Sequence, residues 1–329
     1  MTIKDIARES GYAVGTVSRA LNNAPGVSAE TRQKILEIVN RHNYEPNANA
    51  KHLKQQTNDG IALIVKGTQN MLFAGILEPL QQIIEESGYV ATVYYIDEEA
   101  NEVAQARRIC TERKPHGILF LGSNPEYFTP ELEALGIPCL LLTNSAASPR
   151  IRNLSSVSVD DMAASDTMIE YLYKKGHRRI GIIGGLPRLS STRERIAAYR
   201  EAVADCGLPQ DEALIRFGNS MENSARACLD ELLEQKCDAI VVAQGLMASD
   251  TVIYLHEKGL RLGEDIDLVT FVDYDSNINH LYSNQMDCIV QPVEELGEAA
   301  GEQILQRIES PDAPVFEQVL TSAYKPCGA

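Results

Sequence analysis

The spacing of apolar side chains along the chain changes character near residue 60. Before that point apolar residues recur at three- and four-residue intervals, as in Ile3, Ile6 and Ala7, which is the period of short amphipathic helices. After it, continuous apolar runs such as 61–65 alternate with longer helical stretches, a pattern typical of buried parallel strands joined by helices. The polar segment 55–60 lies between the two patterns and predicts a domain boundary.

Short helices are predicted in the first 46 residues. The apolar period predicts helices over Ile3–Ser10 and Val14–Leu21, separated by a turn that Gly11 suits because a left-handed backbone is cheap for glycine. Ser28 is the predicted N-cap of a third helix. Segment 47–55 has a weak helical pattern, and such a helix would be marginal on its own in water.

The rest of the chain predicts two successive sets of alternating strands and helices. Predicted strands are 61–65, 90–96, 117–121, 138–143, 179–184, 214–217, 239–243, 267–272 and 287–290. Predicted helices are 72–88, 101–114, one ending at 175–176, 191–207, 222–236, 248–259 and 293–309. The fold class is therefore α/β, with a helix-turn-helix head and two lobes of doubly wound parallel sheets. Ligands of such sheets bind beyond the carboxyl ends of the strands, so the region between the lobes is the expected small-molecule site.

Charge separates the same two regions. The first 56 residues carry eight basic and five acidic side chains, a net charge of +3, whereas the whole chain of 329 residues carries −16. The remainder therefore carries −19. We expect the head to meet a polyanion and the acidic body to repel nucleic acid wherever the head is not docked.

The sequence has no pattern typical of a metalloprotein, a membrane protein or a secreted protein. The seven cysteines are scattered singly, without a CxxC pair or a His/Cys cluster, so we expect reduced thiols, no metal site and no cofactor. No apolar run approaches the ~18 residues needed to span a membrane. Residues 1–5 lack the apolar core of a signal peptide, so we expect a cytoplasmic protein.

Two alternative functions follow from the same lobes. An enzyme is disfavoured because the chain has no GxGxxG after its first strand, no GxxxxGK(S/T) loop and no GxSxG turn, so we expect no catalytic residues. A secreted binding protein is disfavoured by the basic head and the missing signal peptide.

The head resembles the DNA-binding region of the LacI/GalR (lactose/galactose repressor) family. The matching stretches are 2–7, 15–22, 27–32 and 43–47, followed by Ala50 and Leu53. In the body, 176–180, 184–185, 193–195 and 291–292 match in the same order. The resemblance covers nearly the whole chain and implies a dimeric transcription regulator, acting as a repressor, with a periplasmic-binding-protein-like effector domain.

Pattern and resemblance together predict four parts. Residues 1–46 form the helix-turn-helix domain, and 47–59 form a hinge helix and linker. The first lobe spans 60–158 with 291–317, and the second spans 159–290 with 318–329. The helices over 72–88 and 293–309 are candidates for dimer packing, and two heads require a near-palindromic operator of double-stranded DNA.

The resemblance implies that the second helix of the head reads bases. Val14 and Gly15 lie where the family reads bases, yet neither side chain can make a polar contact with a base. Sequence choice is then expected to rest on Thr16, Ser18 and Arg19. Arg19 suits a bidentate contact to guanine, with a phosphate clamp as the alternative. Residues suited to phosphates are Thr2, Asn22, Ser28 and Thr31, with helix capping as their alternative role. The resemblance adds Tyr44 as a DNA-binding residue.

Segment 47–55 resembles the family's hinge helix, two copies of which pair in the minor groove. Leu53 matches the leucine that wedges into the central base step. Asn47 and Ala50 match the groove-facing side, and Lys51 would lie near phosphate. A flexible linker is the alternative, and a segment that orders on the operator and is released off it would combine the two.

For the effector, the resemblance implies a site between the lobes. The family's aromatic platform corresponds here to Asn70, Leu72 and Phe73, with Leu72 where a second aromatic is common. Arg195 matches the family arginine that grips effector oxygens, and a surface ion pair with Glu194 or Glu201 is its alternative. Weaker matches at strand ends are Ser123, Asn144 and Gln291.

Two departures from the family bear on the effector's chemistry. Gln244 stands where the family usually has an Asn-Asp pair, and the carboxylate usually found in Gly-Phe-Asp comes one residue later, at Asp273. Such carboxylates bind sugar hydroxyls. Their loss near Arg195 predicts an anionic effector, such as a sugar phosphate or a sugar acid, rather than a free sugar.

Overall fold

The structure is a computed structural model of the chain. It describes residues 3–21, 26–42, 60–67, 71–146, 151–219, 223–273 and 286–327. The chain divides into two compact units, a head over 1–57 and a body over 58–329.

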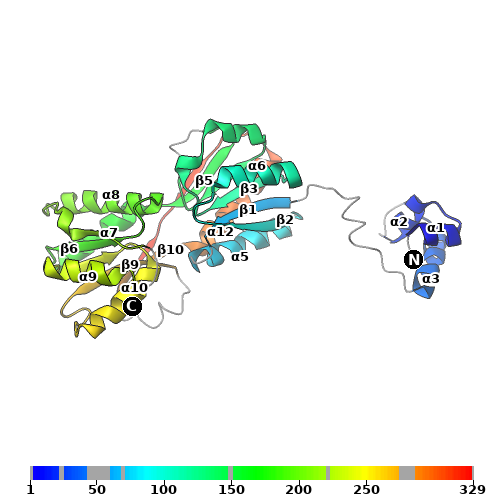
Figure 1. Cartoon of the computed structure of the whole chain (residues 1–329). Coiled ribbons are helices and arrows are strands. Elements are labelled where there is room, and N and C mark those ends of the chain that lie inside the picture. Colours follow the sequence, from blue (N-terminus) through cyan, green and yellow to red (C-terminus); the bar gives the residue numbers. More distant parts are fainter. Residues whose placement is uncertain are drawn as a thin grey trace. The chain divides into compact units, whose positions relative to one another are not determined.

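The described part of the head packs three helices around one small core (Figure 1). Their bounds are α1 (Ile3–Ser10), α2 (Val14–Leu21) and α3 (Ala29–Arg41). Gly11 has φ +75° in the turn between α1 and α2, as predicted for glycine at this position. Ile6, Val17 and Ile35, one from each helix, are fully buried and fix the angle at which α2 lies across the other two.

The first lobe is built on a six-stranded sheet in the order β11-β5-β4-β3-β1-β2, with the strands parallel. The strands are β1 (Gly60–Lys66), β2 (Val90–Ile96), β3 (Gly117–Leu121), β4 (Cys139–Leu142), β5 (Leu154–Val159) and β11 (Glu317–Leu320). The helices are α5 (Met71–Glu86), α6 (Glu102–Arg113), α12 (Val293–Glu309) and two short turns of 3₁₀ helix, η1 (Pro125–Tyr127) and η2 (Pro130–Leu135).

Alternating side chains of β1 face two separate cores. Ile61, Leu63 and Val65 lie in the core beneath α5 and α12. Ala62 and Ile64 lie in the core beneath α6. Because both faces of the strand are covered, β1 is apolar without interruption, as its sequence predicted.

The second lobe repeats this architecture. Its sheet has the order β12-β10-β9-β8-β6-β7. The strands are β6 (Ile180–Gly184), β7 (Ile215–Phe217), β8 (Ala239–Val242), β9 (Asp267–Asp273), β10 (Asp287–Gln291) and β12 (Ala323–Lys325). The helices are α7 (Asp161–Lys175), α8 (Ser190–Asp205), α9 (Ala225–Glu234), α10 (Gly245–Glu257) and the short η3 (Glu212–Leu214).

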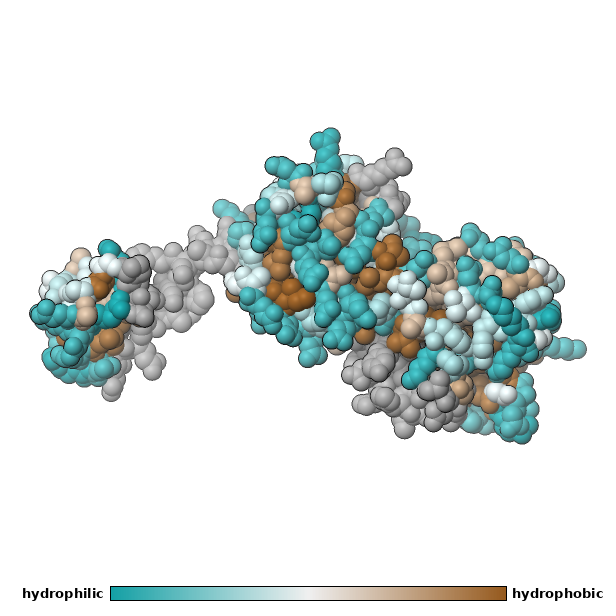
Figure 2. All heavy atoms as spheres, turned by 180° about the vertical axis from the view of Figure 1, so that it is seen from behind, coloured by the Kyte–Doolittle hydropathy of each residue, from teal (hydrophilic) through white to brown (hydrophobic). Residues whose placement is uncertain are grey.

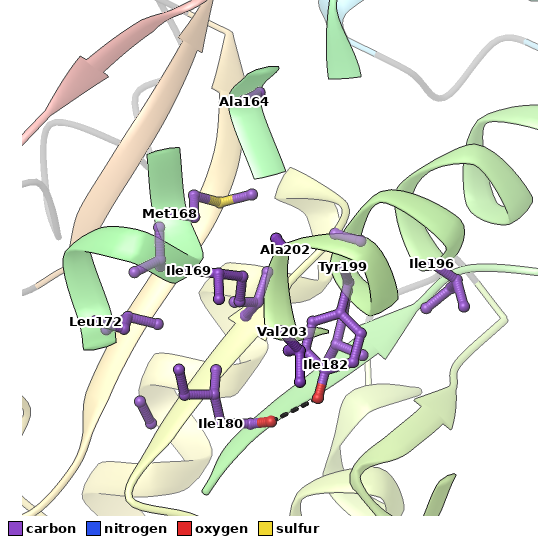
Figure 3. Packing of buried hydrophobic residues seen from close by; sticks show 14 of the residues in the cluster. Ala164, Met168, Ile169, Leu172, Ile180, Ile182, Ile196, Tyr199, Ala202 and Val203 are labelled. Carbon is purple, nitrogen blue, oxygen red and sulfur yellow. Dashed lines mark hydrogen bonds between the residues drawn. The ribbon is translucent and has the colours of Figure 1, made fainter. Parts of the chain in front are cut away.

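Helices α7 and α8 cover one face of this second sheet (Figure 3). Met168 and Leu172 of α7 pack with Tyr199 of α8 over β6. The Tyr199 hydroxyl donates a 2.7 Å hydrogen bond to the Ile180 carbonyl, so the ring fills the core while its polar end is satisfied. Helices α9 and α10 cover the opposite face.

The structure corrects two expectations about the chain's last segment. Strand β11 pairs with β5 in the first lobe, so the return to the second lobe falls after Leu320 rather than at 317–318. Strand β12 then pairs antiparallel to β10, which places one antiparallel edge on an otherwise parallel sheet. Such mixed edges are common in large α/β sheets.

Candidate functional site

Five of the predicted site residues of the body lie where neighbouring strands end. Ser123 and Asn144 follow β3 and β4, which are adjacent in the first sheet. Gln244 follows β8, while Asp273 and Gln291 end β9 and β10 and are paired in register. These are the carboxyl ends of the parallel strands, where ligands of α/β sheets bind.

A hydrogen-bonded group joins the two lobes at this edge. The Asn144 side-chain amide donates to the Ser123 carbonyl oxygen at 2.7 Å, and both residues are buried. The Ser190 hydroxyl, at the start of α8 in the second lobe, donates to Asn144 Oδ1 at 3.2 Å. Asn144 therefore links the end of β3 to the second lobe.

Arg195 is held rigidly inside the second lobe. Its Nε donates to Asp161 Oδ2 at 3.1 Å, and its Nη1 donates to the Ala243 carbonyl at 2.6 Å. The guanidinium carbon lies 3.9 Å from the centre of the Phe271 ring. With its side chain 11% exposed, Arg195 is not the surface ion pair that was the alternative, and its carboxylate partner is Asp161.

Asp161 is a site residue that the sequence reasoning missed. Two carboxylates, Asp160 and Asp161, follow β5 in the sequence. The Asp160 side chain accepts from the Ala163 amide at 2.9 Å and caps α7, which leaves Asp161 to face Arg195. Two successive carboxylates after a buried strand were the available signal, but sequence alone does not say which one caps the helix.

Several buried polar atoms near this edge have no hydrogen-bond partner among the described residues. They are Ser123 Oγ, Asp161 Oδ1 and Thr192 Oγ1. Thr192 lies in the first turn of α8, between Ser190 and Arg195. Buried polar groups are costly when unpaired, so this group of atoms marks a place suited to a polar ligand.

The aromatic position of the first lobe lies beside the same strand ends. Phe73 is buried, and a Cβ built on Gly122 would lie 2.4 Å from its ring. Glycine is therefore required at position 122, because a side chain there would clash with the Phe73 ring and the backbone has φ +74°. Leu72 is partly buried against the core of the first lobe. Asn70 lies outside the described residues, and the Asp273 side chain is likewise not described.

Ion pairs also connect the rims of the lobes. Arg188 of the second lobe pairs with Glu99 and lies 3.9 Å from Glu98, both of which follow β2. Arg193 of α8 pairs with Glu126 of η1 at 2.7 Å. These exposed pairs contribute little individually, and their value lies in orienting one lobe on the other.

The side chains of α2, in the head, differ in how far they are exposed. Val14 is partly buried against the head core, whereas Gly15 and Arg19 are exposed, and Thr16 and Ser18 are partly buried. The Arg19 Nε lies 3.4 Å from the Gly15 carbonyl. Val14 is therefore partly used for packing, and Arg19 is the exposed cation of this helix.

Ser28 caps α3 as predicted. Its hydroxyl oxygen accepts from the Thr31 amide at 3.2 Å, and its hydroxyl donates to Thr31 Oγ1 at 2.9 Å. Ser28 remains exposed, so a phosphate contact is compatible with the cap. The other DNA-contact predictions, which fall on residues outside the described part of the chain, are Thr2, Asn22, Tyr44, Asn47, Ala50, Lys51 and Leu53.

Two kinds of feature are absent from the residues that the structure describes. Within them, no three His, Cys, Asp or Glu side chains are grouped so as to hold a metal ion. None of the helices in the described ranges is long and apolar enough to cross a membrane.

Comparison with known proteins covers both units. Residues 2–47 match the family "Bacterial regulatory proteins, lacI family", and residues 169–325 match the "Periplasmic binding protein-like domain". The chain is 29% identical to the HTH-type transcriptional regulator MalR of Clostridium butyricum over 313 residues, 94% of this chain and 93% of MalR.

Two solved structures are similar in fold. The Lac repressor dimer bound to operator and the anti-inducer ONPF has a TM-score of 0.84 at 22% identity, covering 99% of this chain and 98% of that one. The complex of the transcriptional regulator CelR with cellobiose has a TM-score of 0.72 at 24% identity, covering 100% of both chains. At these identities the likeness concerns the fold alone.

Proposed function

This chain belongs to the LacI/GalR family of DNA-binding transcriptional regulators, and from that premise we propose that it is a cytoplasmic repressor that binds a near-palindromic operator as a homodimer. A sugar bound between the two lobes changes its affinity for the operator. The observation that carries the effector proposal is the set of unpartnered polar atoms of Ser123, Asp161 and Thr192, of which Asp161 also pairs with Arg195. A ligand rich in hydroxyl groups, which donate and accept, would satisfy all of them.

The structure changes the expected charge of the effector. The anionic ligand was predicted because carboxylates appeared to be missing near Arg195. Asp161 supplies such a carboxylate at 3.1 Å and already balances the guanidinium charge. A phosphate placed there would meet Asp161 as well as Arg195, so we now favour a neutral sugar.

Operator binding rests on the head. Helix α2 is the second helix of a helix-turn-helix, whose N-terminal part contacts base edges in the major groove. Arg19 is exposed on α2 and suited to a guanine, and Ser28 at the start of α3 is suited to a phosphate. The hinge residues proposed to reach the minor groove are Asn47, Ala50, Lys51 and Leu53.

The homodimer proposal draws on the first lobe. Helices α5 and α12 were the dimer candidates; they pack on each other, and a Cβ at Gly297 would lie 2.4 Å from the Ile76 carbonyl, so a dimer contact is left to their other faces. The edge strand β2 is the better candidate, since Val90 and Tyr95 are each 59% exposed. On the face seen in Figure 2, apolar residues of the first lobe form separate patches among polar ones. The fold is that of a repressor solved as a dimer on its operator.

A melting-temperature screen tests the effector proposal. The purified protein is heated with neutral sugars, sugar phosphates, sugar acids and nucleosides, and ligand at 100 times its Kd should add about 2.7 kcal/mol to stability. Arg195→Ala is the matched control, which should remove the shift. A panel in which no sugar raises the melting temperature, or in which Arg195→Ala responds like the wild type, contradicts a sugar site between the lobes.

A further inference from the structure

Lys66 and Glu102 form a buried ion pair in the first lobe. Lys66 is the last residue of β1 and Glu102 is the first residue of α6, and their Nζ and Oε2 atoms lie 3.0 Å apart. The two side chains are 7% and 0% exposed, so water screens the pair very little. Both residues lie at the carboxyl edge of the sheet, where the proposed effector site is.

Stability alone does not account for this pair. Burying two charges carries a large desolvation cost, and replacing a buried pair by apolar side chains of similar size is often neutral or stabilising. A role in positioning other groups is the remaining physical reason to keep it, and the second carboxylate oxygen of Glu102 shows which group is positioned.

Glu102 holds one peptide unit of the site from one side. Its Oε1 accepts from the Asn124 backbone amide at 2.7 Å. The carbonyl of the same peptide unit belongs to Ser123, and it accepts from the Asn144 side chain at 2.7 Å. The peptide between Ser123 and Asn124 is thus held at both ends, which fixes the backbone from which the unpartnered Ser123 hydroxyl projects.

Two routes lead from this clamp to the second lobe. One runs through Asn144, whose Oδ1 accepts from the Ser190 hydroxyl. The other runs through η1, because the Lys66 ammonium lies 4.8 Å from the centre of the Tyr127 ring. The neighbouring Glu126 pairs with Arg193 of α8. Both routes end in the first turn of α8, which also carries Thr192.

We propose that Lys66 and Glu102 are positioning residues that fix the backbone at Ser123 on one side of the effector site and couple it to α8 of the second lobe. This inference rests on the proposed effector site between the lobes. Lys66 acts by fixing the carboxylate of Glu102 and supporting Tyr127, and Glu102 acts by holding the Asn124 amide. Neither residue is assigned a contact with the ligand.

Hydrogen–deuterium exchange of the full-length, ligand-free protein tests the proposal with two double variants. Lys66→Met/Glu102→Leu removes both the charges and the acceptor for Asn124. Lys66→Met/Glu102→Gln removes the charges but keeps an acceptor oxygen. In the Leu variant, peptides spanning 122–127 should exchange about tenfold faster, since a hydrogen bond to a charged group is lost. Peptides spanning 188–195 should also exchange faster. In both segments the Gln variant should exchange faster than the wild type but more slowly than the Leu variant, because it keeps an acceptor for the Asn124 amide and loses Lys66.

Controls separate positioning from general loosening. Exchange in α9, which belongs to the far face of the second sheet, should not change in either variant. A matched double variant of an exposed pair in the same lobe, Arg107→Met/Glu131→Gln, should leave both segments at the wild-type rate. Ser190→Ala removes the hydroxyl that donates to Asn144 from the second lobe. It should speed exchange in 122–127, which lies in the other lobe. This variant provides the test if the Leu variant does not fold.

Any one of three exchange results would overturn the proposal. Wild-type exchange at 188–195 in the Leu variant, equal acceleration in α9, or unchanged exchange at 122–127 in Ser190→Ala would each overturn the proposal. No ligand is used, so these results are independent of the melting-temperature screen. If that screen finds no sugar while exchange behaves as described, the coupling stands and the effector site is what fails.

Discussion

The Nε atom of Arg195 lies 3.1 Å from Oδ2 of Asp161, although the two residues belong to different helices, α8 and α7. Asp161, together with the Phe271 ring over which the guanidinium stacks, holds Arg195 in one orientation at the edge between the lobes. Asp161 also provides a carboxylate at a site where the sequence predicted that the family's usual carboxylates are missing. The nature of the effector depends on this relationship.

Replacing Arg195 by lysine should weaken sugar binding. A lysine ammonium cannot donate to Asp161 and to the Ala243 carbonyl in a planar fork while stacking on Phe271. We expect Arg195→Lys to bind the sugar found in the screen about tenfold or more weakly, as the loss of a charge-assisted bond implies. Isothermal titration calorimetry measures this, and an affinity equal to that of the wild type would mean that Arg195 does not touch the ligand.

Asp161→Asn should shift ligand preference toward anions. The change keeps the size of the side chain but leaves the Arg195 charge unbalanced at 3.1 Å. We expect the ratio of sugar affinity to sugar-phosphate affinity to fall by roughly tenfold, about 1.4 kcal/mol. Competition titrations with matched pairs of sugar and sugar phosphate provide the ratio. An unchanged ratio would show that Asp161 does not set the charge preference.

Arg19→Ala should reduce operator recognition without unfolding the head. Arg19 is exposed, and in the described structure its side chain contacts only the backbone of its own helix within hydrogen-bond range. A bidentate contact to guanine would make the loss about 1–3 kcal/mol on the operator and much less on unrelated DNA. Fluorescence anisotropy with both DNAs distinguishes this from a phosphate clamp, for which the two losses would be equal.

Thiol chemistry should depend steeply on pH. Burial raises the pKa of Cys237 to about 11 and, with Asp287 nearby, that of Cys288 to about 11. At pH 8 only about 0.1% of each is thiolate, so iodoacetamide should label the exposed Cys327 before either of them. A raised thiol pKa in the folded state also means that stability falls as pH rises from 9 toward 11. Peptide mass spectrometry of labelled native protein checks the order, and early labelling of Cys237 would contradict it.

Periodicity predicted the local elements well. Helices α1 and α2 end where apolar spacing and Gly11 placed their limits, and β2, β3 and α12 have their predicted bounds. Two features of the last segment were missed. The pairing of β11 with β5 and the antiparallel direction of β12 depend on which sheet edge is open, which no local pattern reports.

The site was only partly predictable for the same reason. The family resemblance suggested Ser123, Asn144 and Gln291, and all three lie at strand ends, where the topology brings carboxyl ends together. The roles of Asp161, Lys66 and Glu102 depend on partners far away in sequence. Charged residues are seldom fully buried, whereas the fold buries Lys66 against Glu102 and turns Asp161 to Arg195.

The central claim is that a ligand between the lobes controls DNA binding by the head. The measurement is the affinity of the full-length protein for an operator selected from random DNA, titrated with and without the sugar identified by the melting screen. We expect a near-palindromic site, and an operator affinity that changes at least about tenfold, or 1.4 kcal/mol, at saturating sugar. An affinity that stays the same with sugar bound would contradict it, since a ligand that does not alter DNA affinity cannot act as the effector of a regulator.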